Sequence, residues 1–242
     1  MCTLSWLITE QGFDVFFNRD EKKSRPTALA PRFNEQKNAI YPLDPVGGGT
    51  WLALTVQGTV FCLLNNYQAK NTQLMPENSI SRGLVIPKLI ERNDEVLKSN
   101  LLDLTLLSKT LPLKNMSPFI LCYFPSKVTN DNDIQVINWD GDNLSDNVAI
   151  SPIVSSGFDL TGVSKNRLAS YSDDITDQKQ HLAFHCSHQP ERSAYSVCMH
   201  REDAHTVSFT HIQVRAENSL LHYTDDAPCL ASASSISFIL ER

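Results

Sequence analysis

The N-terminal stretch MCTLSWLITEQGFDVFFNRDE constrains the fold more than any other part of the chain. Residues 2–8 and 12–18 are apolar, strand-like runs on either side of Gln11-Gly12, and glycine at this place is typical of a tight hairpin turn. Val15–Phe17 is a continuous apolar run, as in a strand that is buried on both faces. We therefore predict an N-terminal β-hairpin.

Such a hairpin would bring the end of its second strand back to the level of Cys2. Asn18, Arg19 and Asp20 are therefore expected close to this cysteine. If Met1 is removed, Cys2 gains a free α-amine that can act as the base for its own thiol, as in N-terminal nucleophiles. A nearby guanidinium favours the thiolate, and a carboxylate can orient the amine. The alternative is that Cys2 is a packing residue beside a solvated charge cluster.

Composition narrows the class of protein. The 242 residues are 41% hydrophobic and 20% charged, with a net charge of −6. This ordinary globular balance fits one large domain over residues 1–242, and the acidic surface argues against a nucleic-acid partner. The sequence has no secretory signal and no apolar run of the ~20 residues that span a bilayer. We expect a soluble, cytoplasmic protein without a transmembrane segment, and its oligomeric state stays open.

Hydrophobic periodicity predicts further elements along the chain. The expected strands or strand-like apolar segments are Thr50–Val56, Thr59–Leu64, Phe119–Phe124, Ile134–Trp139, Val148–Val154, Tyr195–Met199, Val207–His211 and Ile236–Leu240. The expected helices run from Ser79 or Ser81 to about Arg92, from an Asp94 cap past Leu107, and over Ser164–Tyr171. Residues 22–46, which are polar and rich in proline, are expected to form a long loop. This order indicates an α+β fold with helices on antiparallel sheets.

The spacing of the cysteines and histidines bears on metal binding. The six cysteines include no C-x-x-C pair, so neither a disulfide framework nor a zinc ribbon is predicted. On a helix, His181, His185 and His188 would share one face, with Cys186 among them, and this would suit a metal or haem-iron site. The alternative is a polar surface segment, because residues 172–180 are strongly hydrophilic. We favour the surface segment and predict no metal site.

Three successive glycines, Gly47–Gly49, precede Trp51. No Lys-Ser or Lys-Thr pair follows them and the next element is a strand, so a phosphate loop is discounted. Glycine allows another part of the backbone to approach closely. Trp51 either lines a ligand pocket or belongs to the core, and the sequence does not separate the two.

Several short motifs taken together resemble the transport and Golgi organisation 2 family, also called the NRDE family. They are Met1-Cys2-Thr3, Asn18-Arg19-Asp20-Glu21 with Arg25-Pro26, Gly48-Gly49-Thr50-Trp51-Leu52, Asn66-Tyr67 and Ser81-Arg82-Gly83. The match is dense over residues 1–90 and weak beyond. The later Leu-Ser-Asn segment of the family is not evident, and Val154-Ser155-Ser156-Gly157 stands in that region.

The resemblance implies a four-layer αββα sandwich of the N-terminal-nucleophile-hydrolase type, an α+β fold similar to that of choloylglycine hydrolases. By that analogy Cys2 would be the nucleophile, Arg19 and Asp20 its supports, and Asn66 a candidate oxyanion donor. The candidate ligand-binding residues are Asn18, Arg19, Asp20, Glu21 and Trp51.

The family resemblance also implies a function, although fold alone does not settle function. The leading expectation is an intracellular haem-binding and haem-trafficking protein. One alternative is an N-terminal cysteine amidohydrolase or acyltransferase that acts on a C–N or thioester bond. A second is an acyl-coenzyme A or lipid-binding protein without turnover. In each case the partner is an amphipathic small molecule; haem would be cargo, and no cofactor is required.

Overall fold

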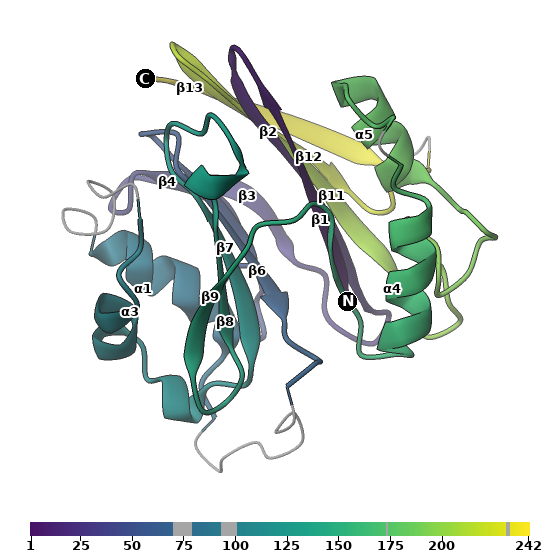
Figure 1. Ribbon diagram of the computed structural model, residues 1–242, viewed down its shortest axis with the longest axis horizontal. Helices are drawn as coiled ribbons and strands as arrows, with labels where there is room; N and C mark the ends of the chain where they lie inside the picture. The colour runs from purple at the N-terminus through teal and green to yellow at the C-terminus, as the bar shows by residue number, and fades with distance from the viewer. Residues whose placement is uncertain (70–78, 93–100, 173, 231–232) are drawn as a thin grey trace. The chain divides into compact units, whose positions relative to one another are not determined.

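The computed structural model describes residues 1–69, 79–92, 101–172, 174–230 and 233–242 (Figure 1). These residues form two compact units, and each is described by itself. The first unit comprises Met1–Pro26 and Ile150–Glu241, and the second comprises Thr27–Ala149 and Arg242. Each unit is built on one antiparallel sheet. That the chain works as one domain stays a prediction.

The first unit contains a six-stranded sheet in the order β10-β1-β2-β11-β12-β13. Its strands are β1 Cys2–Thr9, β2 Gly12–Lys22, β10 Ile153–Ser155, β11 Ala204–Arg215, β12 Asn218–Asp225 and β13 Ser234–Glu241. Two helices, α4 Leu160–Ala169 and α5 Gln178–Cys186, lie on one face of this sheet (Figure 1). The expected C-terminal strand and the expected third helix are confirmed as β13 and α4.

The N-terminal hairpin is confirmed. Strands β1 and β2 pair in register from Cys2 opposite Arg19 to Thr9 opposite Gly12. Gly12 has φ +138°, and a Cβ there would lie 2.0 Å from the carbonyl oxygen of Val214. The turn therefore needs glycine both for its backbone conformation and because β11 passes close beside it.

The hairpin expected from Tyr195–Met199 and Val207–His211 is wrong in its first half. Strand β11 instead pairs with β2 on one side and β12 on the other. In residues 195–199 the serine side chain bonds to nearby backbone: the Ser196 hydroxyl donates to the carbonyl of Cys198 at 2.7 Å. Such local bonds compete with a strand ladder, so the apolar alternation is not enough to make a strand.

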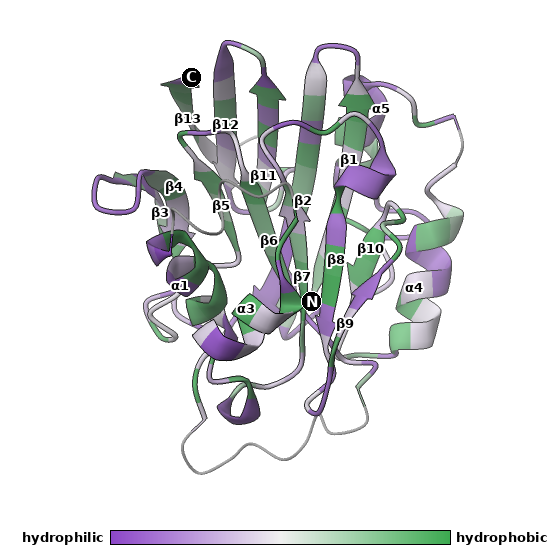
Figure 2. Cartoon of the chain, turned by 60° about the vertical axis from the view of Figure 1, so that its left-hand side comes forward, coloured by the Kyte–Doolittle hydropathy of each residue, from purple (hydrophilic) through white to green (hydrophobic). Residues whose placement is uncertain are grey.

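The second unit contains a seven-stranded sheet in the order β3-β4-β5-β6-β7-β8-β9. Its strands are β3 Leu29–Asn34, β4 Ala39–Leu43, β5 Leu52–Thr55, β6 Val60–Asn65, β7 Phe119–Phe124, β8 Gln135–Trp139 and β9 Leu144–Asn147. Its helical segments are η1 Arg82–Leu84, α1 Val85–Glu91, α3 Leu104–Thr110, η2 Leu113–Asn115 and η3 Asp131–Asp133. The edge strand β9 is largely hydrophilic (Figure 2), and polar edges discourage pairing with another chain.

The long loop expected over residues 22–46 is wrong, because β3 and β4 lie within it. Pro31 is tolerated since β3 is an edge strand, where a missing N–H breaks no ladder on the open side. Pro42 lies in the part of β4 beyond Ala39 and Ile40, the two residues that pair with β5. Pro31 and Pro42 therefore lie at unpaired positions of strands, whereas Pro26 and Pro45 lie outside the strands.

The expected helices of the second unit are partly confirmed. Pro87 is the third residue of α1, within the first turn, where a backbone N–H has no partner inside the helix. The helix α3 is capped by the Asp103 side chain, which accepts a hydrogen bond from the N–H of Thr105. The expected cap Asp94 lies outside the described residues.

Two of the short family motifs meet in the second unit. The N–H of Thr50 donates to the carbonyl of Gly83 at 2.9 Å. A Cβ on Gly49 would lie 2.1 Å from the carbonyl carbon of Gly83. The glycines in these two motifs therefore serve close backbone packing and leave no room for a side chain at Gly49.

In the described part of the chain, no helix has the length and apolar character that would let it cross a membrane.

Candidate functional site

The alternation of strand β2 divides the Asn18–Glu21 motif between two faces of the six-stranded sheet. Residues directly opposite each other in neighbouring antiparallel strands share a face, and Cys2 lies opposite Arg19. Arg19 and Glu21 therefore share the face of Cys2. Asn18 and Asp20 point to the other face, which carries the helices α4 and α5.

Cys2 and Arg19 belong to a row of polar side chains that crosses five neighbouring strands. The paired positions are Ser155 with Cys2, Cys2 with Arg19, Arg19 with Ser208, and Ser208 with Asp225. A hydroxyl, a thiol, a guanidinium, a second hydroxyl and a carboxylate thus follow one another on one face. Because they stand on paired strands, their order is fixed by the backbone.

Arg19 is nearly buried, with 7% of its surface exposed. Its Nη2 lies 3.4 Å from Oε2 of Glu21. The same carboxylate oxygen lies 3.6 Å from Nε of Arg25. Glu21 therefore lies between two cations, and the row that contains Cys2 and Arg19 also contains the Asp225 carboxylate.

The Cys2 thiol differs from the sequence-based expectation. Burial raises its pKa above the ordinary value. The α-amine of Met1, the Arg19 guanidinium and the backbone of Asp20 act in the opposite direction, whereas the Asp20 carboxylate adds to the rise. The expected stabilisation of the thiolate by Arg19 exists, but burial outweighs it. The thiol is therefore protonated at neutral pH while Met1 is in place.

Met1 bridges the end of the hairpin. Its α-amine donates to the carbonyl of Asp20 at 3.0 Å, and the N–H of Asp20 donates to the carbonyl of Met1 at 2.8 Å. Its sulfur accepts a hydrogen bond from the Ser156 hydroxyl at 2.8 Å. Removal of Met1 would break these contacts and place the new amine of Cys2 beside the backbone of Asp20.

The Asp20 carboxylate forms a buried ion pair on the helix side of the sheet. Its Oδ2 accepts from both Nη atoms of Arg167 at 3.1 Å, and its Oδ1 accepts from the Thr206 hydroxyl at 2.7 Å. Both charged side chains are fully buried. Arg167 also donates to the hydroxyl of Thr3 at 2.6 Å. The carboxylate therefore has partners other than a Cys2 amine, and its role in catalysis stays a prediction.

Sequence reasoning did not single out Arg167. It lies four residues after Val163 on the buried side of α4. The available signal was indirect: an aspartate in a buried strand needs a cation, and this arginine lies on a predicted helix.

The Asn18 side chain joins strand β2 to two other segments. Its Nδ2 donates to the carbonyls of His185 and Val197 at 2.9 and 3.0 Å. Its Oδ1 lies 3.0 Å from Nδ1 of His185. With these bonds Asn18 positions α5 and the chain around Val197. A direct role for Asn18 in ligand binding stays a prediction.

His181 and His185 are buried, so the expectation of a surface segment is wrong. The Ser5 hydroxyl lies 2.9 Å from Nδ1 of His181 and 2.9 Å from Nε2 of His185. Nδ1 of His185 faces Asn18, so its proton belongs there, and Ser5 donates to Nε2 and accepts from His181. Burial lowers the pKa of His181 to about 4 and that of His185 well below its usual value. Both rings are neutral members of an internal hydrogen-bond network. Helix α5 ends at Cys186, and His188 lies beyond it.

Trp51 and Asn66 belong to the second unit. Trp51 is 7% exposed, as expected for a core aromatic residue. The Nδ2 of Asn66 donates to the carbonyl of Trp139 at 3.3 Å, and its Oδ1 accepts from the N–H of Gln68 at 3.1 Å. Their roles as pocket wall and oxyanion donor stay predictions.

These features define a class of protein. The α+β architecture, with a cysteine on the first strand and a charged second strand beside it, has the fold of N-terminal-nucleophile hydrolases. A Caenorhabditis elegans N-acylethanolamine-hydrolyzing acid amidase ortholog is similar over 99% of this chain and 100% of its own, with a TM-score of 0.53 and 11% identity. A C2A mutant of the conjugated bile acid hydrolase from Clostridium perfringens gives a TM-score of 0.46 and 12% identity, over 100% of this chain and 96% of its own. At such low identity the amidase shows the fold alone.

The particular family follows from the sequence. A model of the transport and Golgi organisation 2 family matches residues 1–227, and the chain belongs to this family. The match extends well beyond the first 90 residues that carry the short motifs. No curated protein matches the sequence.

Proposed function

We propose that this protein binds haem as an intracellular cargo at the sheet face that carries Cys2 and Arg19. The observation that carries the proposal is the pairing of Cys2 with Arg19 in directly opposite positions of β1 and β2. This pairing puts a sulfur ligand and a fixed cation next to each other. Family membership supports the same reading.

The chemistry of haem fits these neighbours. Haem has two carboxylates, and a guanidinium binds carboxylates through paired hydrogen bonds. Haem iron accepts a cysteine sulfur as an axial ligand. Leu4 lies opposite Phe17 one step further along the same face; both side chains are fully buried, so the polar pair adjoins apolar core residues that a ligand would have to displace or pack against. An apolar surface with one cation is what an amphipathic, anionic ligand requires.

A hollow of the first unit that lies away from Cys2 fits this ligand less well. It is lined by α4, α5 and the segments that follow them, including Asp174, Gln180 and Phe184. Among its described lining residues there is an aspartate and no lysine or arginine. A carboxylate-bearing ligand would find no cation there, so we assign haem to the Cys2 face.

The raised pKa of the Cys2 thiol favours binding over catalysis while Met1 is present. A protonated thiol is a weak nucleophile, and while Met1 is present the N-terminal α-amine belongs to Met1 and not to Cys2. Binding to ferric iron would itself supply the charge that stabilises the thiolate.

The alternative is an N-terminal cysteine amidohydrolase or acyltransferase. One observation favours it: Met1 precedes Cys2 and is hydrogen-bonded to the backbone of Asp20. Its removal would therefore leave a new amine on Cys2 next to the thiol and beside that backbone. The similar amidase is named for hydrolysing N-acylethanolamines, and an acyl amide or an acyl-coenzyme A is the corresponding substrate class here. Acyl-coenzyme A binding without turnover needs the same cation and apolar surface.

The Cys2→Ser variant separates these functions, with Cys186→Ser as the matched control that removes another thiol. If the protein is a carrier, Cys2→Ser shifts the absorption spectrum of the haem complex or lowers the affinity for haem, and Cys186→Ser changes neither the spectrum nor the affinity. For a hydrolase, Cys2→Ser removes turnover of acyl-amide or thioester substrates and leaves ligand affinity nearly unchanged. Intact mass measured on the same samples shows whether Met1 is present. Haem complexes that are identical in both variants would contradict the proposal.

A further inference from the structure

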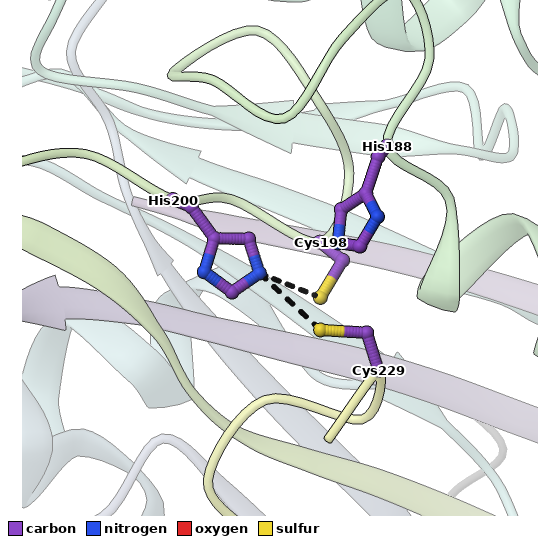
Figure 3. A group of neighbouring side chains, drawn as sticks. All are labelled: His188, Cys198, His200 and Cys229. Atoms are coloured by element: carbon purple, nitrogen blue, oxygen red, sulfur yellow. Dashed lines mark hydrogen bonds between the residues drawn. The ribbon is translucent and has the colours of Figure 1, made fainter. Parts of the chain in front are cut away.

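We propose that His188, Cys198, His200 and Cys229 bind one Zn²⁺ ion in a tetrahedral site. The ligand atoms of these four side chains all lie within 4.8 Å of one another (Figure 3). They come from three separate segments: the chain after α5, the chain before β11, and the connection between β12 and β13. The site lies within the first unit and is distinct from the face that carries Cys2.

The distances match a tetrahedral zinc centre. Nε2 of His200 lies 3.6 Å from Sγ of Cys198 and 3.3 Å from Sγ of Cys229, and Figure 3 shows both contacts as dashed lines. With Zn–S near 2.3 Å and Zn–N near 2.05 Å, the edges of the tetrahedron are about 3.3–3.8 Å. Two edges are thus already formed, and the other distances, which are at most 4.8 Å, would have to shorten by no more than about 1.0–1.5 Å.

The donor set selects the metal. Two thiols and two imidazoles are a borderline-soft set that suits zinc, whereas Mg²⁺ and Ca²⁺ prefer oxygen ligands. Four protein ligands fill the tetrahedron and leave no position for substrate, which is the pattern of a structural zinc site.

His188 gives an independent indication of a ligand. Its Nε2 is buried and has no hydrogen-bond partner among the described residues. Its ring centroid lies 5.2 Å from that of His200. Buried polar atoms are normally satisfied, and a bond from Nε2 to the metal would satisfy this one.

Without metal, the ring of His200 carries its proton on the nitrogen that would bind the metal. A guanidinium can only donate, so Nδ1 of His200 accepts from Arg192 across 3.3 Å. The proton of the neutral ring is then on Nε2, between the two sulfurs. On metal binding this proton moves to Nδ1, and the exposed Arg192 side chain must withdraw. Zinc binding therefore competes with the Arg192 contact.

The backbone holds the ligands in place without the metal. Cys198 and His200 stand on either side of Met199. The N–H of Met199 donates to the Thr206 hydroxyl at 2.8 Å, and the N–H of Thr206 donates to the carbonyl of Met199 at 2.9 Å. The N–H of Cys198 donates to the carbonyl of Ser187 at 3.0 Å. Residues 187, 198 and 200 are thereby fixed close together, which lowers the entropic cost of assembling the site.

The site would stabilise an irregular part of the first unit. Residues 187–203 connect α5 to β11 without a helix or a strand, and a connection of this length is unusual in a compact fold unless something holds it. Zinc would link this connection to the one between β12 and β13. The carbonyl of Val197 in the same connection accepts from Asn18, so the metal also supports strand β2.

Metal content of the full chain tests the proposal. Reduced protein is stripped with a chelator, dialysed and titrated with Zn²⁺ against a chromophoric competitor, and Co²⁺ is used as a spectroscopic probe. We expect one Zn²⁺ per chain, and thiolate-to-cobalt charge-transfer bands with the strong visible bands of tetrahedral cobalt. Cys229→Ser and His188→Gln should each weaken zinc binding by at least about tenfold. Cys186→Ser is the matched control: its thiol contacts the carbonyl of Pro228, next to Cys229, but Cys186 is not one of the four ligands, so the variant should bind zinc like the wild type.

Three results would overturn the proposal. The first is wild-type protein that binds no more zinc than Cys229→Ser. The second is a Cys198–Cys229 disulfide that persists in freshly reduced protein. The third is a cobalt spectrum without thiolate charge transfer. Circular dichroism of each variant distinguishes loss of the site from loss of the fold, and His188→Gln leaves both thiols in place if a serine variant fails to fold. Arg192→Gln is expected to bind zinc more tightly than the wild type.

Discussion

Cys2 lies directly opposite Arg19 in the pairing of β1 with β2, and the two side chains share one face of the six-stranded sheet. Asn18 and Asp20, the alternate residues of the same strand, point to the opposite face and bond to α4, α5 and the chain before β11. The Asn18–Glu21 motif therefore consists of two alternating pairs of residues with different structural roles. Arg19 and Glu21 accompany Cys2, whereas Asn18 and Asp20 hold the helices on the sheet.

The reactivity of Cys2 should follow its raised pKa. We expect slow alkylation by iodoacetamide at pH 7 in protein that retains Met1. The rate should rise about tenfold for each pH unit below the thiol pKa, because only the thiolate reacts. Arg19→Gln should slow the reaction further, since Arg19 lowers that pKa. Residue-resolved mass spectrometry measures the rates, and fast labelling that does not change between pH 6 and 8 would show instead a thiolate of low pKa.

The buried pair of Asp20 and Arg167 should dominate the stability of the first unit. Asp20→Asn leaves the Arg167 charge buried without its counter-ion, which costs about 3–5 kcal/mol of the free energy of unfolding. Asp203→Asn is the surface control: that side chain is 55% exposed, and removal of its pair with Arg201 should cost about 0–1 kcal/mol. Urea denaturation compares the two variants.

A double variant tests whether Asp20 and Arg167 stabilise the fold as a pair. Asp20→Leu combined with Arg167→Met removes both charges, and it should be less destabilised than the sum of the single changes because no unpaired charge is left. Additive losses would show that the two side chains do not act as a pair.

The sequence predicted the parts of this site that depend on local pattern. The hairpin turn at Gly12 and the return of Arg19 to Cys2 follow from strand periodicity alone. The division of the motif between two faces also follows from that periodicity, once the register is known. The pairing of Asp20 with Arg167 does not, because the two residues are 147 positions apart and no local rule joins them.

Other features were beyond sequence reasoning for similar reasons. His181 and His185 lie in a hydrophilic part of the sequence, yet bonds to Ser5 and Asn18 permit their burial. The metal pattern considered from the sequence, which we did not favour, was a run of histidines on one helix. The observed cluster of His188, Cys198, His200 and Cys229 is assembled by tertiary structure, and its only local signal is the Cys198-Met199-His200 spacing.

Stability should fall as the pH drops from about 6.5 to about 4. Burial lowers the pKa of folded His181 to about 4, although Asp14 acts in the opposite direction, whereas an unfolded histidine titrates near 6.5. Between these values the unfolded state binds the additional proton, so the histidine's contribution to stability is complete above about pH 6.5 and is lost on acidification. The loss is up to about 1.4 kcal/mol per pH unit for each such histidine.

The variant His181→Gln isolates this effect. Its free energy of unfolding, measured in urea at several values between pH 4 and 7, should depend less steeply on pH than that of the wild type. Parallel pH profiles would show that His181 is not buried in the neutral form.

Zinc should protect the two cluster thiols and raise the thermal stability. Ligand binding stabilises the folded state by RT ln(1 + [L]/Kd), about 2.7 kcal/mol at a hundredfold excess over Kd. We therefore expect Zn²⁺ to raise the Tm of the wild type and of Cys186→Ser. The Tm of Cys229→Ser should not change. Zn²⁺ should also slow alkylation of Cys229 without slowing that of Cys2. Equal shifts in Tm for all three proteins would place the zinc elsewhere.

The central claim is that Arg19, held opposite Cys2, is the cation that receives the ligand's acidic group. A haem titration of wild type, Arg19→Gln and Arg32→Gln, followed by absorbance at pH 7, tests it most directly; Arg32 is an exposed arginine on β3 of the second unit. We expect Arg19→Gln to weaken haem binding by about tenfold or more, since a charge-assisted hydrogen bond contributes about 1.5–3 kcal/mol, and Arg32→Gln to bind like the wild type. Arg19→Lys serves if the glutamine variant does not fold, and should retain part of the affinity. Equal haem affinity in wild type and folded Arg19→Gln would contradict the account.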